Sequence, residues 1–314
     1  MKAVCIHSFG GSEVVSVEDA PLPTVSASDD VLVQVRAAGV NPIDWLFRNG
    51  FGQEMFHHRL PLTLGCDVSG TVEKVGSAVR RFKVGDAVYG YLNLARNGAF
   101  AEYALAKDSE LGPKPERLDF MQAASIPVVF LTAFQSIFDL GGLQSGQRLL
   151  VHGASGGVGS SAVQLGKWKG AYVIGTCSGR NSDFVRKLGA DEVIDYQTTR
   201  FEEAARDIDV VLDTIGGETQ ERSWQLLRKG GTLVATIQSP APEKMAEYKV
   251  NGKFVNAIPD GERLAELAPL FDSGVFRTYV ETVLPFDQAA KALELSESKR
   301  VRGKIVLRIR NGSS

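Results

Sequence analysis

The chain has 314 residues, of which 44% are hydrophobic and 23% are charged, as in an ordinary globular protein. Its formal net charge of −2 argues against a dedicated nucleic-acid-binding protein, which is usually basic. No apolar run reaches the ~18 residues that a membrane span needs, and the length predicts two domains, each with its own core.

The three cysteines, Cys5, Cys66 and Cys177, lie far apart in the sequence. An odd number of widely spaced cysteines is typical of reduced thiols rather than of a disulfide framework. The N-terminal residues also lack the long apolar segment of a secretory signal. Together these features predict a cytoplasmic protein.

Residues 1–120 are rich in short β-prone runs that are separated by turns. The run over 31–36 alternates along part of its length, and the runs over 70–76 and 87–90 are bounded by glycines. Gly85 and Asp86 form a typical turn signal between two of them. This pattern predicts a compact, mostly β domain.

Beyond residue 120, strand and helix patterns alternate. We expect helices over 121–125, 132–138, 183–188 and 219–227, with an interruption near Pro127, and strands over 148–151, 171–175, 192–194, 209–212 and 231–236. Alternation at this spacing predicts a doubly wound parallel sheet, and therefore an α/β fold.

The last part of the chain, from residue 259 on, adds helices over 261–271 and 286–295 and a final strand over 304–309. We expect that strand to return to the first domain. The first domain would then comprise residues 1–120 and 259–314, and the second would comprise residues 121–258. Residues 311–314 are predicted to be a frayed end.

A glycine-rich turn follows the apolar run over 149–151 and leads into a helical pattern. Gly156 and Gly157 allow the backbone to approach a phosphate, and Gly159 allows the helix to pack closely on the strand. The free N–H groups at the start of a helix favour an anion. A strand, a glycine turn and a helix in this order predict a dinucleotide site, with N–H groups of 155–158 facing the pyrophosphate.

The turn after the next strand indicates which dinucleotide is bound. An NAD site usually has an acidic residue there, which accepts hydrogen bonds from the ribose hydroxyls. Residues 177–181 contain no acid, and Arg180 and Ser178 are suited to a phosphate. We therefore favour NADPH over NADH. The alternative is that Arg180 is only a solvated residue at a helix start.

Eight short segments, taken in order, resemble the zinc-free quinone oxidoreductases of the medium-chain dehydrogenase/reductase superfamily. They are 38–44, 64–72, 98–103, 131–134, 153–159, 193–196, 213–217 and 302–307. The resemblance covers nearly the whole chain. It implies a GroES-like, mostly β catalytic domain, a Rossmann domain with a doubly wound parallel sheet, and a homodimer that forms through an edge strand near residues 254–256.

Zinc alcohol dehydrogenases of the same superfamily hold a catalytic metal with Cys, His and Cys. The matching positions of this chain are Asn41, the pair Cys66 and Asp67, and the apolar run over 128–130. We therefore expect no metal. Without a Lewis acid the acceptor itself must stabilise negative charge, as quinones and α,β-unsaturated carbonyl compounds do.

The resemblance and the glycine turn together give the expected site residues. The catalytic candidates are Asn41, Asp44, Trp45 and Asp67, and the cofactor contacts are Asn41, Thr132, Ser155, Gly156, Gly157, Val158, Ser178, Arg180, Tyr196 and Lys304, with Lys167 as a further candidate for the 2′-phosphate. Structural alternatives stay open: a turn role for Asn41, a core role for Trp45, an ordinary helical role for Thr132 and a charged strand end at Lys304.

These features predict an NADPH-dependent, zinc-independent oxidoreductase that transfers a hydride to a quinone or an α,β-unsaturated carbonyl compound. Two alternatives remain. One is a reductase of enoyl-thioester or alkenal double bonds, which the same fold supports. The other is a protein that binds NADPH without turnover, such as a redox sensor or a crystallin-like protein, since binding alone needs the same turn. No nucleic-acid or membrane partner is expected.

Overall fold

The computed structural model describes residues 1–310, apart from the side chain of Glu54. The chain forms two compact units. Unit 1 comprises residues 1–128 and the chain from residue 258 on, and unit 2 comprises residues 129–257. The frayed end predicted at 311–314 lies outside the described residues.

Unit 1 is built on two antiparallel or mixed sheets. The larger sheet has seven strands in the order β15-β16-β3-β5-β6-β8, with β7 paired to β3. Its strands are β3 (Asp30–Val40), β5 (Asp67–Val75), β6 (Ala87–Tyr91), β7 (Tyr103–Lys107), β8 (Leu111–Pro113), β15 (Val280–Pro285) and β16 (Lys304–Arg308). The smaller sheet, in the order β2-β1-β4, consists of β1 (Lys2–Ile6), β2 (Val15–Asp19) and β4 (Leu62–Thr63).

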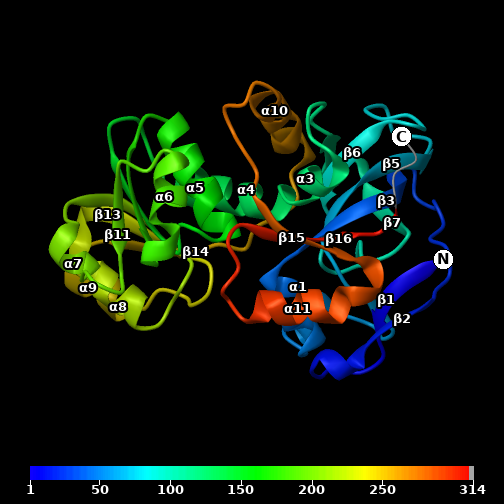
Figure 1. The fold of residues 1–314 in the computed structure, drawn as a ribbon, viewed down its shortest axis with the longest axis horizontal. Helices are drawn as coiled ribbons and strands as arrows, with labels where there is room; N and C mark the ends of the chain where they lie inside the picture. The colour runs from blue at the N-terminus through cyan, green and yellow to red at the C-terminus, as the bar shows by residue number, and fades with distance from the viewer. Residues whose placement is uncertain (311–314) are drawn as a thin grey trace. The chain divides into compact units, whose positions relative to one another are not determined.

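Strand β3 is the centre of the larger sheet because it pairs with β5, β7 and β16. Its β-branched residues Val31, Val33 and Val35 are fully buried in the core of unit 1. The prediction that the last strand returns to the first domain is confirmed, since β16 pairs antiparallel with β3 (Figure 1).

Helices cover the sheets of unit 1. They are α1 (Pro42–Arg48), α2 (Gln53–Phe56), α3 (Phe120–Ala124), α10 (Gly261–Asp272) and α11 (Ala289–Glu297), with short helical turns η1 (Ser12–Val14), η2 (Asp108–Glu110) and η6 (Phe286–Gln288). Helix α11 packs against α1 (Figure 1). Helix α3 contacts β3 and β5, so it belongs to unit 1. Unit 2 therefore begins at residue 129, eight residues later than the boundary at residue 121 that we expected from the sequence.

Unit 2 contains one six-stranded parallel sheet in the order β11-β10-β9-β12-β13-β14. The strands are β9 (Arg148–His152), β10 (Tyr172–Cys177), β11 (Glu192–Asp195), β12 (Ile208–Asp213), β13 (Leu227–Ala235) and β14 (Asn251–Phe254). Leu149, Leu150 and Val151 are fully buried, as is typical of a strand covered on both faces. The α/β fold class with a parallel sheet is confirmed.

Helices of unit 2 connect these parallel strands. They are α4 (Pro127–Phe134), which begins in unit 1, and α5 (Gly157–Trp168), α6 (Ser182–Lys187), α7 (Phe201–Ala204), α8 (Glu218–Ser223) and α9 (Pro242–Tyr248), with η3 (Gln135–Leu140), η4 (Gly179–Asn181) and η5 (Trp224–Leu226). The order β9, α5, β10 places the predicted glycine turn at the carboxyl end of β9, where doubly wound sheets bind ligands.

Candidate functional site

The glycine turn presents the start of a 12-residue helix to the carboxyl edge of the sheet. Gly156 is the N-cap of α5, it is extended, and no side chain caps the helix there. The N–H groups of Gly157 and Val158 have no intrahelical acceptor because they lie in the first turn. Gly156 differs, because its own N–H donates to the carbonyl oxygen of Gly153 at 3.0 Å. The uncapped helix start therefore suits an anion.

The two glycines that flank this helix start are constrained differently. A Cβ atom placed on Gly156 would lie 3.5 Å from the Gly153 oxygen, with no other described atom within 4 Å. A Cβ atom on Gly159 would lie only 2.2 Å from that same oxygen. Gly159 is therefore required by packing within the protein, whereas the space beside Gly156 is open. An approaching phosphate fits this arrangement.

Asn181 joins the glycine turn to the turn that follows β10. This buried side chain donates from Nδ2 to Ser155 Oγ at 3.1 Å and to Ser178 Oγ at 3.3 Å. Sequence reasoning identified both serines but gave Asn181 no role. Its position, directly after Arg180 in a turn without acids, was the signal available.

Ser178 and Arg180 lie at the carboxyl end of β10, and Tyr196 follows β11 with 59% of its surface exposed. The Tyr196 N–H donates to the Cys177 carbonyl at 3.2 Å, which keeps the two strand ends together. The neighbouring strand adds an acid: a Cβ atom on Gly179 would lie 2.5 Å from Asp195 Oδ2. The turn itself lacks an acid, yet a carboxylate lies beside it.

Lys167 lies elsewhere. It is near the C-terminal end of α5 and forms an ion pair with Asp191, which precedes β11 at the amino edge of the sheet. The helix start and the turn after β10 are at the opposite edge. We therefore exclude Lys167 from the residues that could contact a cofactor phosphate.

A network of buried polar side chains forms a second candidate site, within unit 1. Asn41, which follows β3 and is the N-cap of α1, donates from Nδ2 to Asp67 Oδ2 at 2.8 Å. Lys304 Nζ donates to Asp67 Oδ2 and to the Val40 carbonyl, each at 3.0 Å, and to Asn41 Oδ1. Asp67 Oδ1 accepts from the N–H of Val128 at 2.8 Å. The topology thus joins residues that are far apart in the sequence.

Asp44 lies beside this network. Its Oδ2 accepts from the Asn41 N–H at 2.8 Å, as an acidic residue in the first turn of a helix commonly does. Burial raises the pKa of Asp44 to about 7, against the lowering effects of that N–H and of Lys304. Burial also raises the pKa of the neighbouring Cys66 thiol. Burial therefore favours the neutral form of Asp44 far more than in an exposed aspartate.

Two other sequence candidates occupy packed positions. Trp45 is partly buried against the core of unit 1, and its Nε1 is a buried donor with no acceptor among the described residues. Thr132 lies in the middle of α4 and is 8% exposed. The structure thus brings Asn41, Asp44, Asp67 and Lys304 together within unit 1, and Ser155 to Val158 with Ser178 and Arg180 within unit 2.

The residues present do not fit a zinc ion. Across residues 1–310, no group of three His, Cys, Asp or Glu side chains is placed to hold a metal. The ammonium group of Lys304 bonds both Asn41, which matches one zinc-ligand position, and Asp67, which follows the position of a second, Cys66. A cation is thus already supplied by the chain itself.

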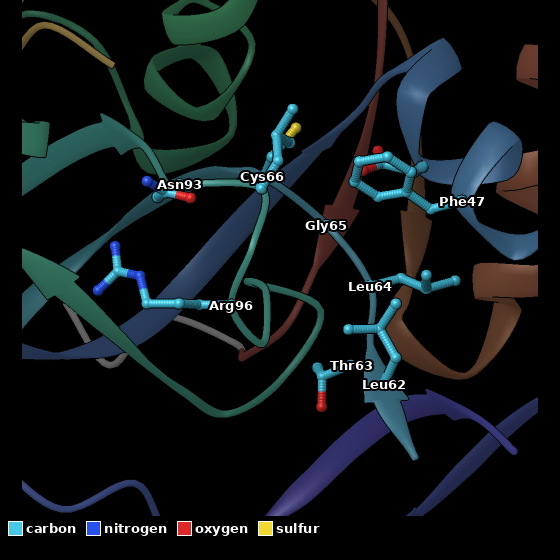
Figure 2. Close-up of a pocket in the computed structure, with 10 residues that line it drawn as sticks. Phe47, Leu62, Thr63, Leu64, Gly65, Cys66, Asn93 and Arg96 are labelled. Carbon is cyan, nitrogen blue, oxygen red and sulfur yellow. The ribbon is translucent and has the colours of Figure 1, made fainter. Parts of the chain in front are cut away.

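A small cavity in unit 1 adjoins Asp44 and Cys66. Figure 2 shows Phe47 of α1 and Arg96 of the loop after β6 on opposite sides of it. Its volume of about 10 Å³ is room for about one water molecule. The cavity is too small to hold a quinone.

Two family models match the chain. One, described as an alcohol dehydrogenase GroES-like domain, matches residues 27–116, and the other, described as a zinc-binding dehydrogenase, matches residues 188–307.

Within the described residues, no helix is both long and apolar enough to cross a membrane.

Similar proteins cover almost the whole chain. The NAD(P)H oxidoreductase RTN4IP1, mitochondrial, of Mus musculus is 34% identical over 98% of this chain and 89% of its own length. The quinone oxidoreductase of Mus musculus is 31% identical, with 98% and 97% covered.

Solved structures agree with these relatives. The quinone oxidoreductase from Coxiella burnetii has a TM-score of 0.92 at 33% identity, with 99% of each chain covered. The quinone oxidoreductase of Escherichia coli, solved in complex with NADPH, has a TM-score of 0.87 at 27% identity, covering 98% of this chain and 100% of that one. The CurK enoyl reductase has a TM-score of 0.89 at 25% identity, with 98% and 99% covered.

Proposed function

This chain belongs to the quinone oxidoreductases of the medium-chain dehydrogenase/reductase superfamily, and we propose that it transfers a hydride from NADPH to a quinone or an α,β-unsaturated carbonyl compound. It is an oxidoreductase of the kind that uses NAD(P)H. The choice of NADPH, the class of acceptor and independence from zinc are the parts that we propose.

The single observation that carries the proposal is the uncapped start of α5 beside an open glycine position. The N–H groups of Gly157 and Val158 would bind the pyrophosphate, and the missing side chain of Gly156 would leave room for it. NADPH, when bound, supplies the hydride. Arg180 and Ser178 at the end of β10 would bind the 2′-phosphate, with Tyr196 beside them. A similar protein was solved with NADPH, which supports this assignment.

The chemistry of unit 1 supports the proposed class of acceptor. A lysine ammonium buried among oxygen atoms is not a Lewis acid that an alcohol oxygen could reach, so alkoxide chemistry has no support there. A quinone that accepts a hydride spreads the charge into a phenolate, and an enone spreads it into an enolate. Water or a weak donor can then supply the proton, and the protein binds and orients the reactants.

Asn41, Asp44, Trp45 and Asp67 are the residues that we assign to the acceptor side. Asn41, Asp44 and Asp67 form one buried, hydrogen-bonded group. Trp45 comes directly after Asp44 on α1. Asp44, with a pKa of about 7, is the group of these four that is best suited to exchange a proton near neutral pH.

The test is NADPH oxidation by chelator-treated protein against benzoquinones, a polycyclic ortho-quinone, short alkenals and an enoyl-CoA. We expect turnover to survive chelation and to favour the quinones or the alkenals. A preference for the enoyl-CoA would favour the second candidate, a double-bond reductase such as the similar CurK enoyl reductase. Tight NADPH binding with no turnover of any acceptor would instead indicate a sensor.

Homodimer formation through β14, the edge strand of the six-stranded sheet, is a separate proposal. Phe254 on this strand is 37% exposed, and Ile258 just beyond it is 63% exposed. Large apolar side chains exposed beside an edge strand are suited to a partner surface. The mass in solution tests this proposal, and a monomer at micromolar concentration would contradict it.

The cytoplasmic location stays a prediction, which now rests on three free, buried cysteines.

A further inference from the structure

The ammonium group of Lys304 has no hydrogen-bonding capacity left for a ligand. An ammonium has three N–H donors, and all three have acceptors inside unit 1: Val40 O, Asn41 Oδ1 and Asp67 Oδ2. The residue is only 5% exposed, and Asp67 is fully buried. The predicted contact between Lys304 and the cofactor therefore lacks a free donor.

The network also determines which way the Asn41 side chain points. Its Oδ1 faces a cation and its Nδ2 faces a carboxylate. If the amide were turned over, its NH₂ would face the ammonium and its oxygen would face the carboxylate. Both contacts would be repulsive, so the charges of Lys304 and Asp67 fix one orientation.

We propose that Lys304 is a positioning residue for the reaction: its ammonium is an internal cation that holds Asn41 and Asp67 in one arrangement. The role in the reaction rests on the proposed function, whereas the effect on the Asn41 amide does not. The ammonium fixes both the end of β3, through Val40, and the start of α1, through Asn41. Asp67 extends the arrangement to the start of α4, through the Val128 N–H.

The first experiment replaces Lys304 with Met, which keeps most of the length of the side chain and removes the charge. We expect kcat/KM for the best acceptor to fall by about 10²-fold, the size of effect that a small misplacement of a reacting group can have. The Kd of NADPH should change far less than kcat/KM, because the residues that we assign to the 2′-phosphate and pyrophosphate are in unit 2 and only the expected contact of Asn41 is affected. The control is Arg308→Met, which removes an exposed positive charge from the same strand. An unchanged kcat/KM in Lys304→Met would overturn the proposal.

A double variant separates positioning from charge balance. Lys304→Met with Asp67→Asn leaves no unpaired buried charge, so the melting temperature should return towards that of the wild type. The new amide at position 67 can still accept from Val128, but it then directs an N–H towards Asn41 and turns the Asn41 amide over. We therefore expect kcat to stay low. Recovery of both stability and kcat would show that Lys304 only balances charge.

Chemical rescue gives a test of the cation itself. In Lys304→Ala, added propylammonium should restore part of the lost kcat, and 1-propanol, which is similar in size and neutral, should not. Equal effects of the two compounds would contradict a role for the charge.

The positioning role can also be tested by a measurement that does not depend on turnover. This test remains valid even if the proposed function is wrong. In the wild type, the Asn41 side-chain NH₂ should give slowly exchanging NMR signals, because it is buried and bonded to Asp67. These protons should exchange at least about tenfold faster in Lys304→Met, as the amide is no longer held. The same protection in both proteins would overturn the positioning role, even if no acceptor is ever found.

Discussion

Two residues of opposite charge lie at the carboxyl ends of neighbouring strands in unit 2, and each is suited to a different cofactor. Arg180 is suited to the 2′-phosphate of NADPH, whereas the carboxylate of Asp195 is suited to the ribose hydroxyls of NADH. Asp195 was not identified from the sequence as part of the site, because it comes from β11 and not from the turn after β10. We therefore expect the cofactor preference to depend on both side chains.

We predict that Arg180→Ala weakens NADPH binding by about 10-fold to 100-fold, the loss of ~1.5–3 kcal/mol expected for hydrogen bonds to a charged group. NADH binding should change little. Asp195→Asn should shift the preference further towards NADPH by removing a negative charge near the phosphate. Fluorescence titration with both cofactors measures the ratio. Equal losses for NADPH and NADH in Arg180→Ala would mean that this residue does not bind the 2′-phosphate.

At the scale of elements, the segment from β9 into α5 contains two glycines, three residues apart, with different roles. Gly159 is needed for packing of the protein, and Gly156 leaves space for the ligand. Gly159→Ala brings a Cβ atom against a backbone oxygen at 2.2 Å, so either the helix or the turn must move. We expect a loss of ~1–3 kcal/mol in the free energy of unfolding, as for other overpacked positions.

Gly156→Val is the matched variant. The position is in ordinary extended backbone and has open space beside it, so the free energy of unfolding should change little. NADPH and NADH binding should both be lost, because the side chain would occupy the space of the pyrophosphate. Thermal unfolding and cofactor titration of both variants test this contrast. Retained affinity in Gly156→Val would contradict the assigned turn.

The elements that the sequence predicted well were those with a strong local signal. The five predicted strands of unit 2 agree with β9 to β13 to within one residue at most ends, because strands buried on both faces are continuous apolar runs bounded by turns. Helix α1 and strands β2 and β15 were not predicted, since they are short or partly exposed and their patterns are weak, and β14 was expected only from the resemblance, near residues 254–256. Strand β13 begins four residues earlier than expected, in a polar segment.

The buried network of unit 1 could not be predicted in the same way. Asn41 and Asp67 were selected by resemblance, but their contact with Lys304 joins residues 263 and 237 positions apart. No local pattern encodes such a contact, since it depends on β16 pairing with β3. A lysine at the start of an apolar strand looks like an ordinary charged end until its neighbours are known.

For the whole molecule, the two units contain buried titratable groups with opposite effects of pH on stability. In unit 1, the folded state raises the pKa of Asp44 to about 7. The folded protein then holds more protons than the unfolded chain between about pH 4 and pH 7, so stability falls as pH rises through this window. In unit 2, burial lowers the pKa of His152 to about 4, so stability falls as pH drops from about 6.5 to about 4.

We predict that Asp44→Asn stabilises unit 1 above pH 7 and has little effect near pH 4. The amide still accepts from the Asn41 N–H but carries no charge to bury. The gain should be a few kcal/mol at most, since one pKa unit corresponds to ~1.4 kcal/mol. Hydrogen exchange of peptides from each unit, measured from pH 5 to pH 8, locates the effect. Unit 2 should respond only at the acidic end, and the same pH dependence in Asp44→Asn as in the wild type would contradict the assignment.

The place of β16 beside β3 also has a consequence for synthesis on the ribosome. All six strands of unit 2 lie between residues 148 and 254, so that sheet can be complete while the chain is still growing. Strand β3 leaves the ribosome long before β16 does. The β7 strand can pair early with residues 30–34 of β3, but the pairing positions at residues 37–40 wait for β16. An unpaired apolar edge is a template for wrong partners. The nascent chain is therefore most prone to aggregate late in translation, until the segment with Lys304 emerges and closes the sheet.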